Sequence, residues 1–214
     1  MSIARAGTGP AAGSEHRLYN AHVAVRCLPS EGKDSMEIIT PRLQLRDFVI
    51  DDWPAVLAYQ SDPRYLRYYE WTERTEEQVR AFVGRFVDNQ NAQPRTKFQP
   101  AIVLRADGRL IGNCGLRLPA PEARVAEMGC ELAPDAWGQG YAAEAARAML
   151  AFGFEHLRLH RVWANCMAEN AAAWHLLEKL GFEREGRLRD HEWFKGRWWD
   201  TLIYGLLEPE RSPQ

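Results

Sequence analysis

The fold is decided by residues 127–145, which read EMGCELAPDAWGQGYAAEA. Residues 127–132 alternate as a strand does, residues 133–136 make a turn, and an Ala-rich helix-forming run follows Gly138 and Gly140. A glycine turn that opens directly into a helix leaves backbone N–H groups unpaired at the positive end of the helix dipole. The stretch therefore predicts a seat for an anionic diphosphate.

Two common diphosphate-binding motifs do not match this spacing. A P-loop needs a Lys followed by Ser or Thr after its second glycine, whereas Tyr141 and Ala142 follow here. A Rossmann fingerprint needs a third glycine and an acidic residue about twenty positions further on. Position 143 is Ala, and the next predicted strand ends with Asn165-Cys166-Met167. The glycine turn fits neither class.

The remaining pattern, Gly-x-Gly-Tyr-Ala-x-Glu-Ala, resembles the GNAT acetyltransferases, and particularly the Rim-type branch that acetylates the N-terminal alanine of ribosomal proteins. The likeness continues through RVWAN (161–165), ENAAA (169–173), LEKLGFEREG (177–186) and GRWWD (196–200), and upstream through TPRLQLR (40–46) and DDW (51–53). It covers roughly residues 36 to 208.

The predicted elements alternate between strands and helices. Strand-like stretches are residues 42–48, 99–105, 110–118, 125–132, 161–167, 182–194 and 198–206. Helices are predicted after Asp51 as N-cap, from the capping box at Thr75, and over 140–156 and 170–180. One helix joins strands 125–132 and 161–167, which predicts that they are parallel. The resemblance implies an α/β fold of GNAT type: a mixed, mostly antiparallel sheet of about seven strands, helices on both faces, and one parallel, splayed strand pair.

The composition is typical of a soluble globular domain. The chain has 214 residues, of which 46% are hydrophobic and 26% charged, enough to bury one sizeable core. A net charge of −2 gives no reason to expect nucleic acid as a partner. No stretch approaches the roughly 18 apolar residues of a membrane helix. The four cysteines include no Cys-x-x-Cys pair, which favours a reducing cytoplasm, no metal site and no disulfide framework.

Three regions are expected along the chain. Residues 1–35 are rich in Gly, Ala and Ser and lack periodicity apart from a short apolar piece at 21–28, which predicts a disordered N-terminal extension. An alternative is that translation begins at Met36. Residues 36–208 are predicted to form the acetyltransferase domain, and 209–214 a short tail. The sequence leaves open whether the protein is a monomer or a homodimer.

The resemblance places acetyl-CoA, as a co-substrate, on the glycine turn. The N–H groups of residues 138–143 are expected to hold its diphosphate, and small residues there let the backbone approach closely. Asn170 is expected to bind the pantetheine amides, to cap its helix, or both. The predicted cofactor-binding residues are Leu132, Ala133, Gly138, Gln139, Gly140, Tyr141, Ala142, Ala143, Asn165, Asn170 and Ala173.

Two carboxylates are candidates for the catalytic base. By the period of two, Glu127 and Glu131 share one face of their strand with Gly129 between them, and either could accept the amine proton through water. A solvated sheet edge or a substrate-binding charge is the alternative. The usual general acids of the family are missing, because Leu177 and Ala173 stand at their positions. A thiol has a pKa near 8.5, so the CoA thiolate leaves with little help.

The acceptor is predicted to be a primary amine. At pH 7 an α-amine with a pKa of about 8 costs roughly 1.4 kcal/mol to deprotonate, against about 4.6 kcal/mol for a Lys amine. This favours a protein or peptide N-terminus. Tyr69, Trp71 and Trp193 are candidates to bind it, although most aromatic residues pack in cores. The alternatives are a small-molecule amine such as an antibiotic or polyamine, and a CoA-binding module without catalysis.

Overall fold

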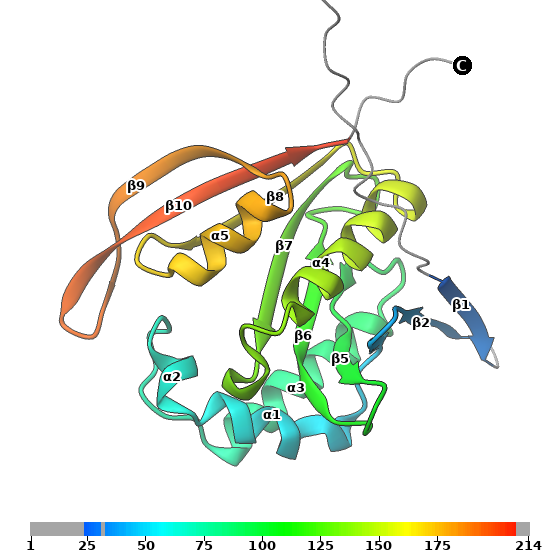
Figure 1. Cartoon of the computed structure of the whole chain (residues 1–214). Helices are drawn as coiled ribbons and strands as arrows, with labels where there is room; N and C mark the ends of the chain where they lie inside the picture. Colours follow the sequence, from blue (N-terminus) through cyan, green and yellow to red (C-terminus); the bar gives the residue numbers. More distant parts are fainter. Residues whose placement is uncertain (1–23, 31–32, 209–214) are drawn as a thin grey trace, which may run out of the picture.

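The structure is a computed structural model that describes residues 24–30 and 33–208 (Figure 1). Its strands are β1 (Ala24–Ser30), β2 (Lys33–Ile39), β3 (Leu43–Arg46), β4 (Lys97–Phe98), β5 (Ala101–Leu104), β6 (Leu110–Arg117), β7 (Val125–Leu132), β8 (Arg161–Met167), β9 (Glu183–Phe194) and β10 (Arg197–Leu207). Its helices are α1 (Trp53–Gln60), α2 (Pro63–Leu66), α3 (Glu76–Gln90), α4 (Tyr141–Ala151) and α5 (Ala171–Lys179). Short helical turns cover Ile50–Asp52, Pro134–Ala136 and Phe152–His156.

All these strands belong to one mixed sheet. Its order is β1-β2-β3-β5-β6-β7-β8-β10-β9, and β4 pairs with β6 beside this path. Every pairing is antiparallel except that of β7 with β8. The mixed, mostly antiparallel fold and its parallel pair are therefore confirmed. The sheet has ten strands because β1, β2 and the two-residue β4 join the seven that were predicted.

The β1–β2 hairpin corrects the prediction of disorder over residues 1–35 where that segment is described. Met36 and Ile38 are buried in the core, which fixes β2 beside β3. The outer edge of β2 then offers unpaired backbone groups, which β1 pairs along its whole length. Residues 1–23 and 31–32, and the predicted tail at 209–214, lie outside the described residues.

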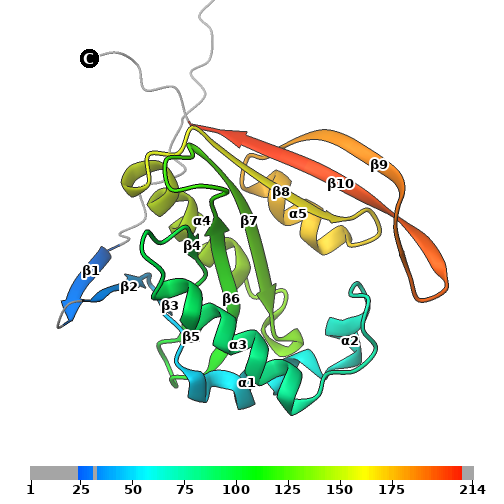
Figure 2. The same cartoon turned by 180° about the vertical axis from the view of Figure 1, so that it is seen from behind.

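Two hydrophobic cores lie on opposite faces of the sheet. Helices α4 and α5 cover one face, and α1 and α3 cover the other (Figures 1 and 2). On β5, Ile102 and Leu104 face the core that holds α4 and α5, whereas Ala101 and Val103 face the core that holds α1 and α3. This is the alternation expected of a strand buried on both faces. The helices on both faces are confirmed, and no described helix is long and apolar enough to span a membrane.

Most helix boundaries agree with the sequence signals. Thr75 and Gln78 form the predicted capping box, with bonds of 3.3 and 3.1 Å. The predicted N-cap Asp51 is wrong: α1 begins after Asp52. The Asp52 carboxylate accepts the Val49 N–H at 2.9 Å and pairs with Arg46 at 2.7 Å, so a short helical turn precedes the helix.

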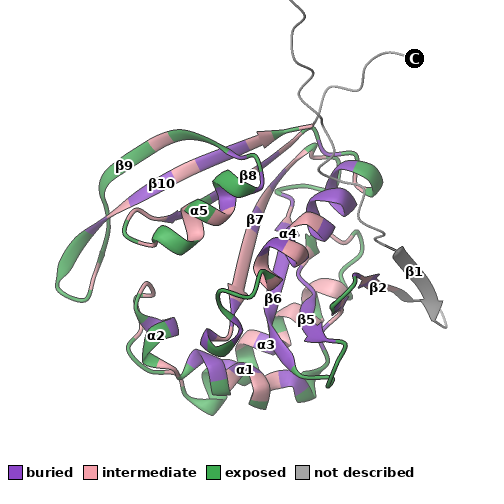
Figure 3. Cartoon of the chain, in the orientation of Figure 1, coloured by how far each residue is buried: buried purple, intermediate pink, exposed green. Residues whose placement is uncertain are grey.

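The parallel strands β7 and β8 pair only at one end. Their register covers Val125↔Arg161, Ala126↔Val162 and Glu127↔Trp163. Beyond Glu127 the two strands diverge, and β8 continues on β10 (Figure 1). The two parts of the sheet that meet at β7 and β8 also differ in burial. On the β7 side, β6 is almost wholly buried, whereas on the β8 side the edge strand β9 is mostly exposed (Figure 3). The splayed pair therefore opens toward the glycine turn that follows β7.

Candidate functional site

The glycine turn lies at the open end of the splay. Gly138 and Gly140 have φ of +74° and +80°, a region that L side chains rarely adopt, and both are exposed. The Trp137 indole N–H donates to the carbonyl of Leu132 at 2.9 Å, which ties the turn back to β7. Helix α4 begins at Tyr141 immediately after the turn.

The N–H groups of this turn are available to a ligand. Among the described residues, nothing accepts from the N–H of Gly138, Gln139 or Gly140. The first bond of α4 runs from Glu144 N–H to the Gly140 carbonyl, so the N–H groups of 141–143 also precede the helical ladder. A Cβ on Gly138 would meet open space. Exposed donors at a helix N-terminus fit a diphosphate.

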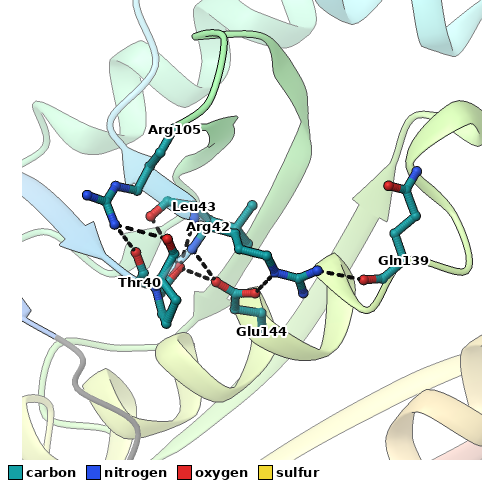
Figure 4. A network of polar contacts seen from close by, with 7 residues as sticks. Thr40, Arg42, Leu43, Arg105, Gln139 and Glu144 are labelled. Carbon is teal, nitrogen blue, oxygen red and sulfur yellow. Dashed lines mark hydrogen bonds and ion pairs between the residues drawn. The ribbon is translucent and has the colours of Figure 1, made fainter.

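A polar network holds this turn from the segment that immediately precedes β3 (Figure 4). Arg42 donates from Nη1 to the carbonyl of Gln139 at 2.9 Å and from Nε to Glu144 Oε2 at 2.6 Å. Glu144 Oε1 also accepts from the Arg42 N–H at 2.9 Å and from Thr40 Oγ1 at 2.7 Å. Burial alone would raise the pKa of Glu144, but these hydrogen bonds outweigh it and hold the pKa below its ordinary value.

Backbone groups of β7 line the gap beside β8. Cys114 of β6 donates its N–H to the Pro100 carbonyl at 3.3 Å, so its backbone polar groups point away from β7. Its register partner Cys130 is therefore a non-hydrogen-bonded position that turns its own N–H and C=O toward β8. Since pairing with β8 ends at Glu127, these groups have no strand partner. An extended ligand with amide groups can pair there.

The predicted face of β7 is confirmed. Ala126, Met128 and Leu132 are buried toward α4, so Glu127 and Glu131 point to the face that carries α1. Helix α4, which follows the glycine turn, and the two carboxylates therefore lie on opposite faces of β7.

Five side chains donate hydrogen bonds to the Glu131 carboxylate. The donors are the hydroxyls of Tyr59 (2.7 Å), Tyr65 (2.5 Å) and Tyr69 (3.4 Å) and the amides of Gln60 (3.2 Å) and Asn113 (2.6 Å). An ionised carboxylate offers about four lone-pair sites, so these donors saturate it. Glu131 is held as a half-buried, fixed negative charge.

Two arginines reach this carboxylate through amide side chains. Arg117 Nη1 donates to Gln99 Oε1 at 3.1 Å, and Gln99 Nε2 donates to Asn113 Oδ1 at 2.6 Å. Asn113 then donates to Glu131. In the second relay, Arg74 Nε donates to Gln60 Oε1 at 3.0 Å, and Gln60 Nε2 donates to Glu131. Because arginine only donates and a carboxylate only accepts, both relays have a fixed direction.

The tyrosines around Glu131 stay protonated. Burial, and then the negative charge of Glu131, raise the pKa of Tyr59, Tyr65 and Tyr69 well above the ordinary tyrosine value. Tyr65 stacks on Tyr69 with ring centroids 4.7 Å apart, and Tyr69 stacks on Trp71 at 4.9 Å. The structure therefore brings the predicted residues Tyr69 and Trp71 together beside Glu131.

Glu127, in contrast, is paired with one arginine. Arg117 Nη2 lies 3.0 Å from Glu127 Oε1, and the Glu127 side chain keeps 30% of its surface exposed. Arg117 Nε also donates to Glu127 Oε2 at 3.3 Å, so among the described residues this carboxylate has one partner where Glu131 has five.

Three other predicted residues lie around the second arm of the splay. Asn170 Oδ1 accepts the N–H of Ala173 at 3.2 Å, so Asn170 caps α5. Asn165 is exposed on β8 and shares the sheet face of Glu127, because its neighbours Ala164 and Cys166 are buried toward α4 and α5.

The predicted residue Trp193 lies apart from Tyr69 and Trp71. It is 60% exposed near the tip of the β9–β10 hairpin and contacts Trp198, with centroids 5.3 Å apart. Trp199 follows Trp198 on β10, so its side chain faces the opposite side of the hairpin, where it contacts Tyr68. Trp193 therefore points away from the aromatic cluster.

Sequence reasoning missed most of the polar side chains that organise the site. These residues are Thr40, Arg42, Tyr59, Gln60, Tyr65, Arg74, Gln99, Asn113, Arg117 and Glu144. One signal was present: Asn113 and Arg117 alternate on β6, and the antiparallel register places them opposite Glu131 and Glu127.

Comparisons with known proteins agree with this arrangement. Residues 42–183 match the model of the acetyltransferase (GNAT) domain. The chain is 35% identical over 175 residues to the uncharacterized N-acetyltransferase YnaD of Bacillus subtilis, covering 82% of this chain and 99% of that protein. A crystal structure of a GNAT-family acetyltransferase from Bacillus anthracis superposes with a TM-score of 0.72 at 34% identity, covering 82% of this chain and all of the other.

Two shorter matches involve relatives with named acceptors. One, 34% over 76 residues, is the ribosomal protein uS5 alanine N-acetyltransferase of Escherichia coli, and covers 36% of this chain and 39% of that enzyme. The other, 35% over 85 residues, is the spermidine N(1)-acetyltransferase of Vibrio cholerae, and covers 40% of this chain and 49% of that enzyme.

Proposed function

The chain belongs to the GNAT acetyltransferase family and is an acetyl-CoA-dependent N-acetyltransferase, and we propose that its acceptor is a protein or peptide N-terminal amine. The observation that carries this proposal is that three carboxylates on or next to the splayed strands β7 and β8 are already paired. Glu127 pairs with Arg117, Glu131 is saturated by five donors, and Glu169 pairs with Arg197 at 2.5 Å. A polycationic acceptor would need free carboxylates, whereas an N-terminus carries a single charge.

An unpartnered donor supports a peptide over a polyamine. The indole Nε1 of Trp71 is buried and has no hydrogen-bond partner among the described residues. A buried donor without a partner is costly, and a peptide carbonyl is an acceptor that would satisfy it. A protonated polyamine carries donors only. We place Tyr69 and Trp71 in the acceptor site and leave Trp193 outside it.

The acetyl-CoA site is proposed on the glycine turn and the splay. The N–H groups of residues 138–143 would hold the diphosphate, with Leu132 and Ala133 beside it at the end of β7. The N–H and C=O of Cys130, which face β8, would pair with the pantetheine amides. Asn165, Asn170 and Ala173 would line the opposite side of the gap, on β8 and the start of α5. CoA then reaches the strand from the α4 side, opposite the acceptor.

The reaction is proposed to be direct attack in a ternary complex. The amine nitrogen forms a bond to the thioester carbon, the C–S bond breaks, and the thiolate leaves. We assign the base role to Glu127 acting through water, because its carboxylate is partly exposed and has lone pairs that Arg117 does not occupy, and an anchoring role to Glu131. Cys114 and Cys166 are disfavoured as nucleophiles: a hydrogen bond with Cys130, and burial, raise the pKa of Cys114, and burial raises that of Cys166 to about 11.

Competing acceptors test this proposal. Release of CoA thiol would be measured with a peptide that has a free N-terminal alanine and no lysine, the same peptide with a blocked N-terminus and one lysine, and spermidine. We expect turnover with the first alone, and mass spectrometry should locate the acetyl group on the α-amine. Preferential turnover of spermidine would assign the enzyme to small-molecule amines.

A further inference from the structure

We infer that Arg42, which immediately precedes β3 and lies outside the glycine motif, is a positioning residue for the acetyl-CoA diphosphate. This inference rests on the acetyl-CoA site proposed above. Arg42 precedes the glycine turn by almost 100 residues, and its guanidinium lies against that turn (Figure 4). A Cβ built on Gly140 would be 3.4 Å from Arg42 Nη2.

The first effect of Arg42 is to aim a donor. In a trans peptide unit the C=O and the following N–H point in opposite directions. Arg42 Nη1 holds the carbonyl of Gln139 at 2.9 Å, so the N–H of Gly140 points away from the guanidinium. That N–H is one of the donors with no acceptor among the described residues. Without Arg42, this peptide unit could rotate, because Gly140 on one side of it has wide conformational freedom.

The second effect is to cancel a charge. Glu144 lies in the first turn of α4, where its carboxylate would repel an anion bound at the helix N-terminus. Arg42 donates to it from both its guanidinium and its backbone, and Thr40 adds a third bond. The guanidinium also lies over the Tyr141 ring, 4.5 Å from its centroid, which fixes its position at the start of the helix.

The arginine of this ion pair is largely exposed, so the pair contributes little to overall stability. The Arg42 side chain is 47% exposed, and such pairs are worth at most about 1 kcal/mol. Its contacts are concentrated on the turn and the first turn of α4. The function that its position serves is therefore the geometry and charge of the anion seat.

Calorimetric titration with acetyl-CoA, together with steady-state kinetics, tests this role. Arg42→Ala is expected to raise the Kd and KM for acetyl-CoA about tenfold or more, which is the effect of losing a charge-assisted hydrogen bond. The kcat and the KM for the acceptor should stay within twofold. The Kd of Arg42→Lys should lie between those of wild type and Arg42→Ala, because lysine keeps the charge but cannot bond Gln139 and Glu144 at once as the guanidinium does.

A double variant separates the two effects. Arg42→Ala with Glu144→Gln also removes the carboxylate that Arg42→Ala leaves without its ion-pair partner, so it should recover part of the acetyl-CoA affinity lost in Arg42→Ala. The control is Arg80→Ala, which removes an arginine of similar exposure from a pair with Glu76 (2.8 Å) on α3 and should leave acetyl-CoA binding unchanged.

The outcomes are distinct. If the wild-type protein binds acetyl-CoA and Arg42→Ala and Arg42→Lys bind it within twofold of wild type, the inference is wrong and the proposed cofactor site stands. If Arg42→Ala lowers kcat or acceptor affinity as much as cofactor affinity, the residue is merely structural. If the folded wild-type protein binds no acetyl-CoA, the site itself fails.

Discussion

The guanidinium of Arg117 lies directly over Gly129, so that a Cβ at position 129 would be only 2.8 Å from Arg117 Nη1. The missing side chain leaves room for Arg117 to reach Glu127 on one side and Gln99 on the other. Gly129 thus permits the relay that ends at Glu131. Its place between two glutamates on one strand face is a packing requirement of the site.

Gly129→Ala is predicted to impair activity more than stability. The arginine can swing away from the new methyl group, but it then loses its bonds to Glu127 and Gln99. We expect the free energy of unfolding to fall by about 1 kcal/mol and kcat/KM for the acceptor to fall about tenfold. Urea unfolding and initial rates measure the two effects.

The control is Gly84→Ala on α3, where a Cβ meets nothing within 4 Å. Alanine is the better helix former there, so this variant should be more stable by up to about 1 kcal/mol and fully active. Equal losses of activity in both variants would contradict the role given to Arg117.

Asn113→Asp is predicted to make stability depend on pH. Asn113 is 2% exposed and donates to Glu131 at 2.6 Å, so an aspartate there would place two carboxylates in contact. The folded variant must then keep a proton that the unfolded chain releases, and its stability falls as pH rises from 5.5 to 8.

Urea unfolding at both pH values, with Asn113→Leu beside it, measures this effect. The leucine variant loses the hydrogen bond but adds no titrating group, so its stability should follow that of wild type with a constant offset. A constant offset for the aspartate variant too would show that Glu131 is not held as an ionised group.

The tyrosine cluster is predicted to resist alkaline titration. Burial and the Glu131 charge raise the pKa of Tyr59, Tyr65 and Tyr69. The folded state keeps protons that the unfolded state loses above about pH 10, so stability is present below that pH and declines above it. Absorbance of tyrosinate should show these three hydroxyls ionising only as the protein unfolds.

Glu131→Gln removes the charge and should move their ionisation to lower pH. Coincidence of the two titration curves would mean that Glu131 contributes nothing to the cluster.

Substitutions of Trp71 and Trp193 are predicted to differ in their effect on the KM for the acceptor. Trp71→Leu removes the unpartnered indole N–H and the stacking on Tyr69, and should raise the acceptor KM several-fold. Trp193→Ser changes an exposed ring on the hairpin and should leave the acceptor KM within twofold. Peptide kinetics with both variants check this, and the reverse order would move the acceptor site to the β9–β10 hairpin.

Local signals predicted most of the fold. The seven predicted strands follow from alternation over a few residues, and α3 from a capping box four residues long. The β1–β2 hairpin depends on what the edge of β3 offers, which no local window contains. The N-cap at Asp51 failed for a similar reason, since Arg46 recruits the neighbouring Asp52.

The site was predictable only along β7 and its turn. The shared face of Glu127 and Glu131 follows from the strand period alone. Their partners do not: Tyr59 lies 72 positions from Glu131, and Arg42 lies 102 positions from Glu144. Such contacts arise from packing of the sheet against α1 and α4, and so the saturation of Glu131 was visible only in three dimensions.

The central claim is that the turn at Gly138 seats the diphosphate of acetyl-CoA. Its most direct test is calorimetric titration of wild type, Gly138→Asn and Gly138→Asp with acetyl-CoA. Asn and Asp tolerate the positive φ of this position comparably and differ in charge. We predict that wild type binds, that Gly138→Asn binds somewhat more weakly, and that Gly138→Asp binds at least about tenfold more weakly than Gly138→Asn. Absence of binding by the folded wild-type protein, or equal affinities of the two variants, would contradict the claim.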